Sequence, residues 1–171
     1  FLNPKMDISR YSLAEIYESE KTIEIALRNL NSISQKSFYF LAANLKKLTI
    51  IKNSEVTRKY RTKLLEIVNS WPDNKVVLHR LADYHKSKNQ YKKSIKIYEK
   101  ILKGHESNDR DLFLYASNLD KIGNWAEARL LFFKLLEKNP KDTYTLNYVS
   151  YKLALKEQEL GLALELIKKA L

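Results

Sequence analysis

The sequence predicts an all-α fold, a solenoid of about five helix-turn-helix repeats with a period of 34 residues. Three observations predict it. Apolar or small residues recur at this fixed spacing, glycine and proline are scarce, with three of each in 171 residues, and the apolar residues between the turns follow the helical period. A fixed period of this length is typical of stacked supersecondary units, because one unit alone cannot bury its apolar face.

Four columns of residues carry the period. They are Ala26, Tyr60, Ser94 and Ala128; Leu30, Leu64, Tyr98 and Phe132; Ile33, Ile67, Ile101 and Leu135; and Ile23, Thr57, Tyr91 and Trp125. The columns set repeats at 7–40, 41–74, 75–108 and 109–142, with a partial fifth at 143–171. We expect residues 1–171 to form a single domain and, because the chain stops inside an apolar periodic run, to be a piece of a longer protein.

The apolar faces of the helices support each predicted repeat in turn. In 7–40 the second helix carries one residue of each column, and in 41–74 three positions depart from the pattern: Asn44, Lys47 and Tyr60. We expect a looser helix pair there, or a first helix rotated so that its leucines face inward: Leu41, Leu45 and Leu48. In 75–108 the spacing of i, i+3, i+4 and i+7 predicts a first helix with one buried face, made of Leu78, Leu81, Ala82 and His85.

The later turns and helix ends complete the plan. Residues 88–90 are the predicted turn of the third repeat, and Gly123 lies in the turn of the fourth. Pro72 and Pro140 end the second and fourth repeats, since proline cannot continue a helix. In the fifth repeat a buried stripe is predicted from Leu146, Val149, Ser150 and Leu153.

At these positions the chain resembles the tetratricopeptide repeat (TPR). The resemblance rests on Leu78, Leu81, Ala82, Tyr91, Ser94 and Tyr98 in one repeat and on Leu112, Ala116, Gly123, Trp125, Ala128, Phe132 and Pro140 in the next. The first repeat supplies Leu13, Ala14, Tyr17, Ala26 and Leu30. The segment from Leu146 to Ile167 is similar to a unit of bacterial TPR proteins with one extra residue in its turn, and Ala163 does follow Ala128 by 35 residues. The resemblance implies a right-handed solenoid and a bacterial source.

The resemblance also implies a partner-binding groove on the concave side, lined by first helices. It assigns groove positions to Val76, His79, Asp83, Lys86, Arg110, Phe113, Ser117, Asp120, Tyr144, Asn147 and Tyr151. Helical spacing independently places Tyr144, Tyr148 and Tyr151 on one stripe, opposite the buried one. Exposed tyrosines suit peptide capture. In the alternative, Tyr148 packs on the neighbouring repeat and only the other two tyrosines are open.

Chaperone-binding members of the family hold a C-terminal carboxylate with a clamp of Lys and Asn and with further Lys and Arg. The matching positions here are His79, Asp83, Leu114, Tyr144 and Tyr148. None of them supplies the cations, and Asp83 repels a carboxylate. We therefore expect no clamp for a chaperone tail.

The net charge of +11 points to nucleic acid or an anionic membrane as a second class of partner. The excess is carried by 24 lysines against seven arginines, whereas base and phosphate recognition favours the planar fork of arginine. We interpret the lysines mainly as a solvated surface, including a row on the convex side of one second helix: Lys92, Lys93, Lys96, Lys100 and Lys103. Binding of RNA is the alternative function, and an accessory subunit of a cell-envelope assembly is another.

Catalytic and metal-binding patterns are missing from the sequence. It has no phosphate-binding glycine loop, nucleophile elbow or paired-histidine motif, and it has no cysteine. His79 and Asp83 lie one turn apart, but with no nucleophile beside them they predict an ordinary surface pair. His85 is predicted to be a packed, hydrogen-bonded core residue. We predict a scaffold or adaptor without enzymatic activity, cofactor or metal, whose partner is a protein or peptide.

The end of the sequence is apolar without the polar capping helix that closes most solenoids. Its apolar residues are Leu160, Leu162, Leu164, Leu166, Ile167 and Leu171. We expect further repeats, another chain or a second copy to cover this helix. No run of about 18 apolar residues predicts a membrane span. The compartment stays open between bacterial cytoplasm and periplasm or cell envelope.

Overall fold

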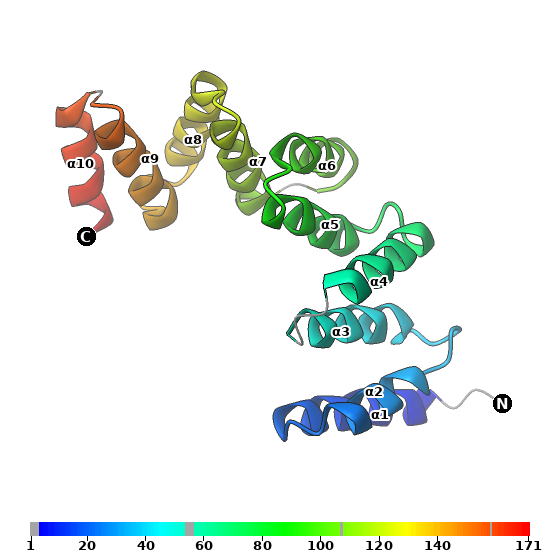
Figure 1. The fold of residues 1–171 in the computed structure, drawn as a ribbon. Helices are drawn as coiled ribbons and strands as arrows, with labels where there is room; N and C mark the ends of the chain where they lie inside the picture. The colour runs from blue at the N-terminus through cyan, green and yellow to red at the C-terminus, as the bar shows by residue number, and fades with distance from the viewer. Residues whose placement is uncertain (1–3, 54–56, 107, 158) are drawn as a thin grey trace. The chain divides into compact units, whose positions relative to one another are not determined.

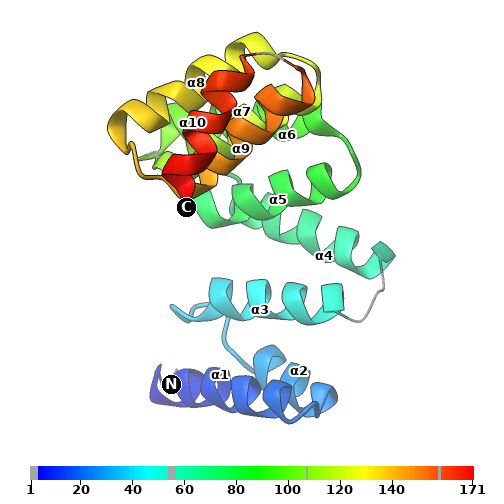
Figure 2. The same cartoon turned by 90° about the vertical axis from the view of Figure 1, so that its left-hand side faces the viewer.

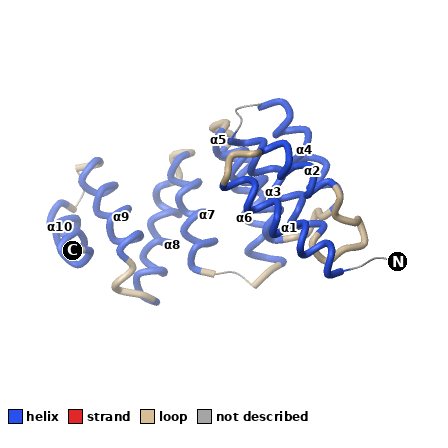
Figure 3. The backbone as a smooth tube through the Cα atoms, turned by 90° about the horizontal axis from the view of Figure 1, so that it is seen from below, coloured by secondary structure: helices blue, strands red, loops and turns tan. Residues whose placement is uncertain are grey.

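The computed structural model describes residues 4–53, 57–106, 108–157 and 159–171. Within these ranges the chain forms ten α-helices joined by turns and loops, and it contains no strand (Figures 1 and 3). None of the helices in the described part of the chain is long and apolar enough to cross a membrane. The packing divides the chain into two units, Phe1–Val77 and Leu78–Leu171.

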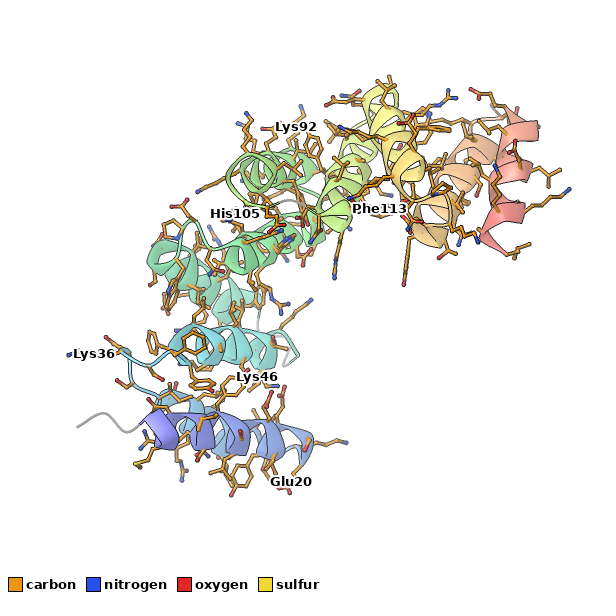
Figure 4. All side chains as sticks on the ribbon, turned by 180° about the vertical axis from the view of Figure 1, so that it is seen from behind. Glu20, Lys36, Lys46, Lys92, His105 and Phe113 are labelled. Carbon is orange, nitrogen blue, oxygen red and sulfur yellow. The ribbon has the colours of Figure 1, made fainter. Side chains whose placement is uncertain are left out.

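The first unit contains two helix pairs, α1 (Pro4–Ser19) with α2 (Ile23–Asn31) and α3 (Phe40–Asn53) with α4 (Thr57–Ser70). In Figure 2, α3 lies alongside the pair of α1 and α2. A buried apolar cluster joins them, made of Ala14, Ala26, Leu30, Ile33, Ala43 and Ile50. Lys46 reaches from α3 to α1, with its Nζ 2.6 Å from a carboxylate oxygen of Glu18 (Figure 4). This hydrogen bond raises the pKa of Lys46.

The first helix of the second repeat keeps the common register. Asn44 is buried at the position that Leu78 and Leu112 occupy in later repeats, and its amide donates to the carbonyl oxygen of Phe40 at 2.8 Å. Leu48 is fully buried at the position of Ala82. A polar side chain is tolerated inside because its hydrogen bond replaces the one lost to water. The hydrogen bond of Asn44 within its own helix thus allows a polar residue at this buried position, and the helix is not rotated.

The second unit contains α5 (Lys75–Ser87, which begins three residues before the boundary), α6 (Tyr91–Gly104), α7 (Asp109–Lys121), α8 (Trp125–Lys138), α9 (Thr143–Leu155) and α10 (Leu160–Ala170). The helices from α6 to α10 each pack on the next one along the chain. Figures 1 and 3 show α7, α8, α9 and α10 in a row. One buried cluster runs through these four helices and a second joins α5, α6 and α7.

Two of the predicted columns are buried in each of the first four repeats. The residues of the second and third columns are Leu30, Leu64, Tyr98, Phe132, Ile33, Ile67, Ile101 and Leu135, and none is more than 3% exposed. Ala26, Ser94 and Ala128 of the first column have no exposed surface, whereas Tyr60 is half-buried. In the fourth column Trp125 is buried but Ile23 is exposed, and the side chain of Thr57 lies outside the described residues. Each helix pair is stabilised by the apolar surface that these buried columns remove from water.

The turns inside the helix pairs repeat as well. Lys21, Asn89, Gly123 and Glu157 adopt the left-handed conformation, with φ between 53° and 87°, and they lie one or two periods apart. The equivalent residue 55 lies outside the described residues. Asn and Gly enter this conformation more readily than other residues. The connection from α9 to α10 is one residue longer than that from α7 to α8, in line with the predicted insertion, and Glu159 adds a second left-handed residue there.

Candidate functional site

A cleft opens in the second unit between the first helices α7 and α9. We call it the α7–α9 cleft; its lining residues are Asp109, Arg110, Phe113, Leu114, Leu135, Asn139, Asp142 and Tyr144. Its volume is about 550 Å³, within the range of sites that hold a large side chain or a small ligand. Three apolar residues form part of the lining, and charged groups stand beside them. The α7–α9 cleft therefore suits an apolar group that carries polar neighbours.

Local capping fixes where the two helices that border the α7–α9 cleft begin. Asn108 begins α7, because its side chain accepts the backbone N–H of Asp111 at 3.0 Å and the carboxylate of Asp111 accepts the N–H of Asn108 at 3.1 Å. Asp142 begins α9 by accepting the N–H of Tyr144 at 3.3 Å. Such caps satisfy N–H groups that have no partner within their helix. The caps thereby fix the first turns of α7 and α9, from which the side chains of Arg110 and Tyr144 extend.

An aromatic cluster lies beneath the α7–α9 cleft. Phe113, labelled on α7 in Figure 4, meets the rings of Phe132 and Tyr148 at centroid distances of 5.3 and 5.5 Å. The rings of Phe132 and Tyr148 are 4.8 Å apart. Phe132 belongs to α8 and Tyr148 to α9, so the three rings tie three consecutive helices together. This packing gives the α7–α9 cleft a rigid floor.

Asp120 is the polar centre of the contact between α7 and α9. Its carboxylate accepts the hydroxyl of Tyr148 at 2.9 Å and pairs with the Nζ of Lys152 at 2.8 Å. The side chain of Asp120 is 3% exposed, so this charge is held inside the protein by two partners on one helix. A buried carboxylate needs such partners because it has lost its water.

Burial and nearby carboxylates raise the pKa of three tyrosines in this unit, Tyr98, Tyr115 and Tyr148, and the rise is largest for Tyr98 and Tyr148. For Tyr148 the causes are burial, then the hydrogen bond to Asp120. For Tyr98 they are burial, then the charges of Asp83 and Asp111. The unfolded chain ionises these phenols near pH 10.0, whereas the folded protein keeps them neutral to higher pH. The stability they contribute is therefore complete below that pH and is lost as the pH rises toward the folded values.

We expect the second unit to lose stability above about pH 10, by about 1.4 kcal/mol per pH unit for Tyr98 and for Tyr148. Replacing Tyr148 by Phe removes one ionising group and makes the decline shallower by that amount. The check is the free energy of unfolding in urea, measured from about pH 8 to pH 11. Tyr144→Phe, at an exposed tyrosine of the same helix, is the control and leaves the profile of the unaltered protein. Equal slopes in the unaltered protein and the Tyr148→Phe variant would contradict the prediction.

The three histidines lie in separate places. His79 pairs across repeats with Asp111 on α7, at 2.9 Å between Nε2 and Oδ1, and not as the predicted surface pair with Asp83. The nitrogen Nδ1 of His85 lies 2.8 Å from the side-chain oxygen of Gln90, so it is hydrogen-bonded as predicted. His85 is half-buried, however, and is not the core residue that the sequence predicts. His105 follows the end of α6. Within the described ranges, no group of three or more acidic or histidine side chains is placed to hold a metal ion.

The structure separates the sequence-predicted groove residues by burial. Val76 lies in the first unit and is exposed. The exposed residues of the second unit are Asp83, Lys86, Arg110, Tyr144, Asn147 and Tyr151. His79, Phe113 and Tyr148 are half-buried, and Tyr148 has the packed placement that the sequence left as an alternative. Ser117 and Asp120 are buried, which corrects their assignment to an open groove surface: Asp120 is used in the contact with α9, and Ser117 donates to the carbonyl oxygen of Leu114.

Several residues of the site escaped the sequence analysis. Asp109, Asn139 and Asp142 border the α7–α9 cleft, and Leu135 was recognised only as a column residue. Asp142 follows Pro140 by two residues, and an Asp after a helix-ending proline is a signal for the next helix cap. Lys152 has no such signal, because its partner Asp120 lies 32 residues away in the sequence.

Solved structures of known proteins share this backbone. MamA from Desulfovibrio magneticus RS-1 superimposes with a TM-score of 0.75 at 13% sequence identity, over 96% of this chain and 93% of that one. A crystal structure of PilW, a type IV pilus biogenesis factor, gives a TM-score of 0.75 at 17% identity, over 99% of this chain and 77% of that one. MamA from AMB-1 gives 0.67 at 15% identity, over 98% and 91%.

Sequence comparison adds no further relative. No protein-family model matches the chain, and no curated protein matches it in sequence. The identities to the solved structures are low, so the likeness concerns the fold. MamA and PilW are TPR-like helical-repeat proteins. The predicted all-α helical-repeat fold is thereby confirmed, and this chain has a TPR-like fold.

Proposed function

We propose that this protein is a non-catalytic scaffold that binds an extended segment or a helix of a partner protein along α7 and α9. One observation carries the proposal. Tyr144 and Tyr151 are 80% and 64% exposed on one face of α9, and Tyr144 borders the α7–α9 cleft. Large, rigid aromatic side chains beside a pocket are typical of the few residues that dominate the energy of protein interfaces.

The chemistry of the surroundings defines the partner segment. An apolar side chain of the partner would enter the α7–α9 cleft over Phe113, Leu114 and Leu135. Arg110 is exposed at the rim and offers a cation to a carboxylate of the partner. Asp109 at the same rim is paired with Lys138 at 2.6 Å, so its charge is already balanced. A segment with an apolar or aromatic residue next to an acidic one fits this arrangement.

The fold supports the same function at a general level. TPR-like repeats are used as protein-interaction scaffolds, and MamA and PilW are neighbours of this kind. PilW is described as a biogenesis factor for type IV pili, which gives a precedent for a TPR-like chain that acts in the formation of a surface structure. Such an accessory role is one form of the same scaffold function.

The test uses peptides selected on the unaltered protein from a displayed random library. We expect each of Tyr144→Ala and Tyr151→Ala to weaken binding of a selected peptide by at least about tenfold, because each removes an exposed aromatic contact. Isothermal titration calorimetry measures the affinity, and circular dichroism checks that the helix content is unchanged. Leu130→Ala, at a residue that is 72% exposed on α8, is the matched control and keeps full affinity. A library that yields no binder, or variants that bind like the unaltered protein, would remove the proposal.

A second candidate function is binding of RNA through the basic surface. The observation that favours it is the lysine row on α6, in which Lys92, Lys93, Lys96, Lys100 and Lys103 are all exposed. Figure 4 shows Lys92 on the side of α6 away from α5. RNA affinity that falls steeply with salt and selects among sequences would favour this candidate over the peptide scaffold.

A further inference from the structure

The second, fourth and fifth repeats dock on the repeat before them through the same four positions of the 34-residue unit. We call positions three, six, seven and ten the docking face. It comprises Ala43, Lys46, Lys47 and Ile50 on α3; Asp111, Leu114, Tyr115 and Asn118 on α7; and Thr145, Tyr148, Val149 and Lys152 on α9. On α3, Ala43 and Ile50 join the buried cluster of α1 and α2. On α7, Leu114 and Tyr115 pack on the cluster of α5 and α6.

The docking face of α1 is exposed. Its residues are Ser9, Ser12, Leu13 and Ile16. Leu13 and Ile16 are 40% and 51% exposed, whereas Val149, at the position of Leu13 in the fifth repeat, has no exposed surface. The two apolar side chains stand one turn apart on the same side of the helix. The helix α1 therefore presents Leu13 and Ile16 as an exposed apolar docking face.

The complementary receiving face is exposed on α9 and α10. An apolar cleft of about 390 Å³ is lined there by Ser150, Tyr151, Ala154, Leu160, Ala163, Leu164 and Ile167. The same positions one repeat earlier are Ala116, Ser117, Asp120, Trp125, Ala128, Arg129 and Phe132. In that repeat α9 packs on these positions, through the contacts of Tyr148 with Phe132 and with Asp120. The exposed fraction of Leu160 is 58%, against 9% for Trp125 at the equivalent position.

We propose that a second copy of this chain fills that cleft head to tail, with its α1 packed on α9 and α10 as α9 packs on α7 and α8. The occupant is a second copy because this one chain carries both halves of the repeat-to-repeat contact, both apolar and both exposed. Leu13 and Ile16 of one copy would lie against Leu160, Leu164 and Ile167 of the other.

The net charges of the first and last repeats do not oppose a contact between two copies. Residues 4–31 carry a net charge of −1 and residues 143–171 a net charge of +1, although the whole chain carries +11. The ends thus avoid the repulsion between the basic middle regions, and their weak opposite charges match. The contact joins two different surfaces, so it continues from copy to copy unless a ring closes.

The test blocks each surface separately in the full chain. Ile16→Glu places a charge on the docking face of α1, and Leu164→Glu places one in the receiving cleft. In sedimentation equilibrium we expect the unaltered protein to grow beyond a dimer with concentration and each variant alone to be a monomer. An equimolar mixture of the two variants forms one heterodimer and stops there, because each contributes one intact surface. Leu130→Glu, on an exposed residue of α8, is the control and associates like the unaltered protein.

Three outcomes would overturn the proposal. They are an unaltered protein that stays monomeric at all soluble concentrations, a variant with one blocked surface that still dimerises with itself, and a mixture that fails to form the heterodimer. Ile16 and Leu164 are exposed, so circular dichroism of both variants is expected to match the unaltered protein. Tyr151 borders both this cleft and the proposed peptide surface, and the blocked positions avoid it. Peptide binding through Tyr144 is measured in the same variants. If they still bind the peptide, the scaffold function holds whether or not the self-association proposal fails.

Discussion

Replacing Phe132 by alanine is expected to destabilise the second unit by about 3–5 kcal/mol. Phe132 has no exposed surface, and its ring contacts Tyr148, Phe113 and Trp125 at centroid distances of 4.8, 5.3 and 6.3 Å. The substitution removes the burial of a phenyl ring and leaves a cavity among three rings that cannot close around it. It also removes the ring contacts that Phe132 makes with Phe113 of α7 and with Tyr148 of α9.

The measurement is urea unfolding followed by the fluorescence of Trp125. The sequence has two tryptophans, and Trp71 lies in the first unit. A Trp71→Phe background therefore makes the signal report the second unit alone. Leu130→Ala, on the exposed face of the same helix, is the control and changes the free energy of unfolding by no more than about 0.5 kcal/mol. A loss below about 1 kcal/mol for Phe132→Ala would contradict the packing described for this unit.

Replacing Asp120 by alanine is the second large effect, and we expect a loss of about 2–3 kcal/mol. The substitution leaves the ammonium group of Lys152, which is 22% exposed, without its carboxylate, and it removes the acceptor of the Tyr148 hydroxyl. The cost arises mainly from the unpaired groups that remain, because breaking one side of a buried pair is worse than removing the whole pair.

A double substitution distinguishes this cause from a general defect. Asp120→Ala combined with Lys152→Met removes both charges, so we expect it to be more stable than Asp120→Ala alone in the same urea experiment. Asp109→Ala is the matched control, since it breaks the exposed pair with Lys138 and changes stability by less than about 1 kcal/mol. Equal stability of the single and double variants would show that the charge of Lys152 is not the cause.

The burial of the second and third columns was predictable from the sequence because it is a property of single helices. Leu30, Phe132 and Leu135 follow both the helical period and the 34-residue repeat. The helix face on which each lies, and its burial, can therefore be predicted from the sequence. The exposure of Tyr144 and Tyr151 follows by the same argument, since they lie opposite a buried stripe on α9. The turn position of Asn89 and Gly123 also repeats with the period.

The polar partners were not predictable, because they join atoms from different repeats. His79 and Asp83 are neighbours on one helix, yet His79 pairs with Asp111 of α7. Asp120 occupies a position that the TPR resemblance assigns to an open groove, yet α9 covers it with Tyr148 and Lys152. The identities of these residues show that they can form hydrogen bonds, but the choice of partner depends on the distance between two helices.

By itself, the sequence determined the repeat length, the helical class, the buried second and third columns and the outward direction of Tyr144 and Tyr151. Each of these follows from periodicity along one helix and from side-chain size. The tertiary structure alone decided that Asp120 and Ser117 are buried and that the α7–α9 cleft is bordered by Asp142 and Asn139. The reason is physical, because packing one repeat on the next brings together side chains that are about 30 residues apart in the sequence. Some polar groups become buried and paired in these contacts, and others stay exposed.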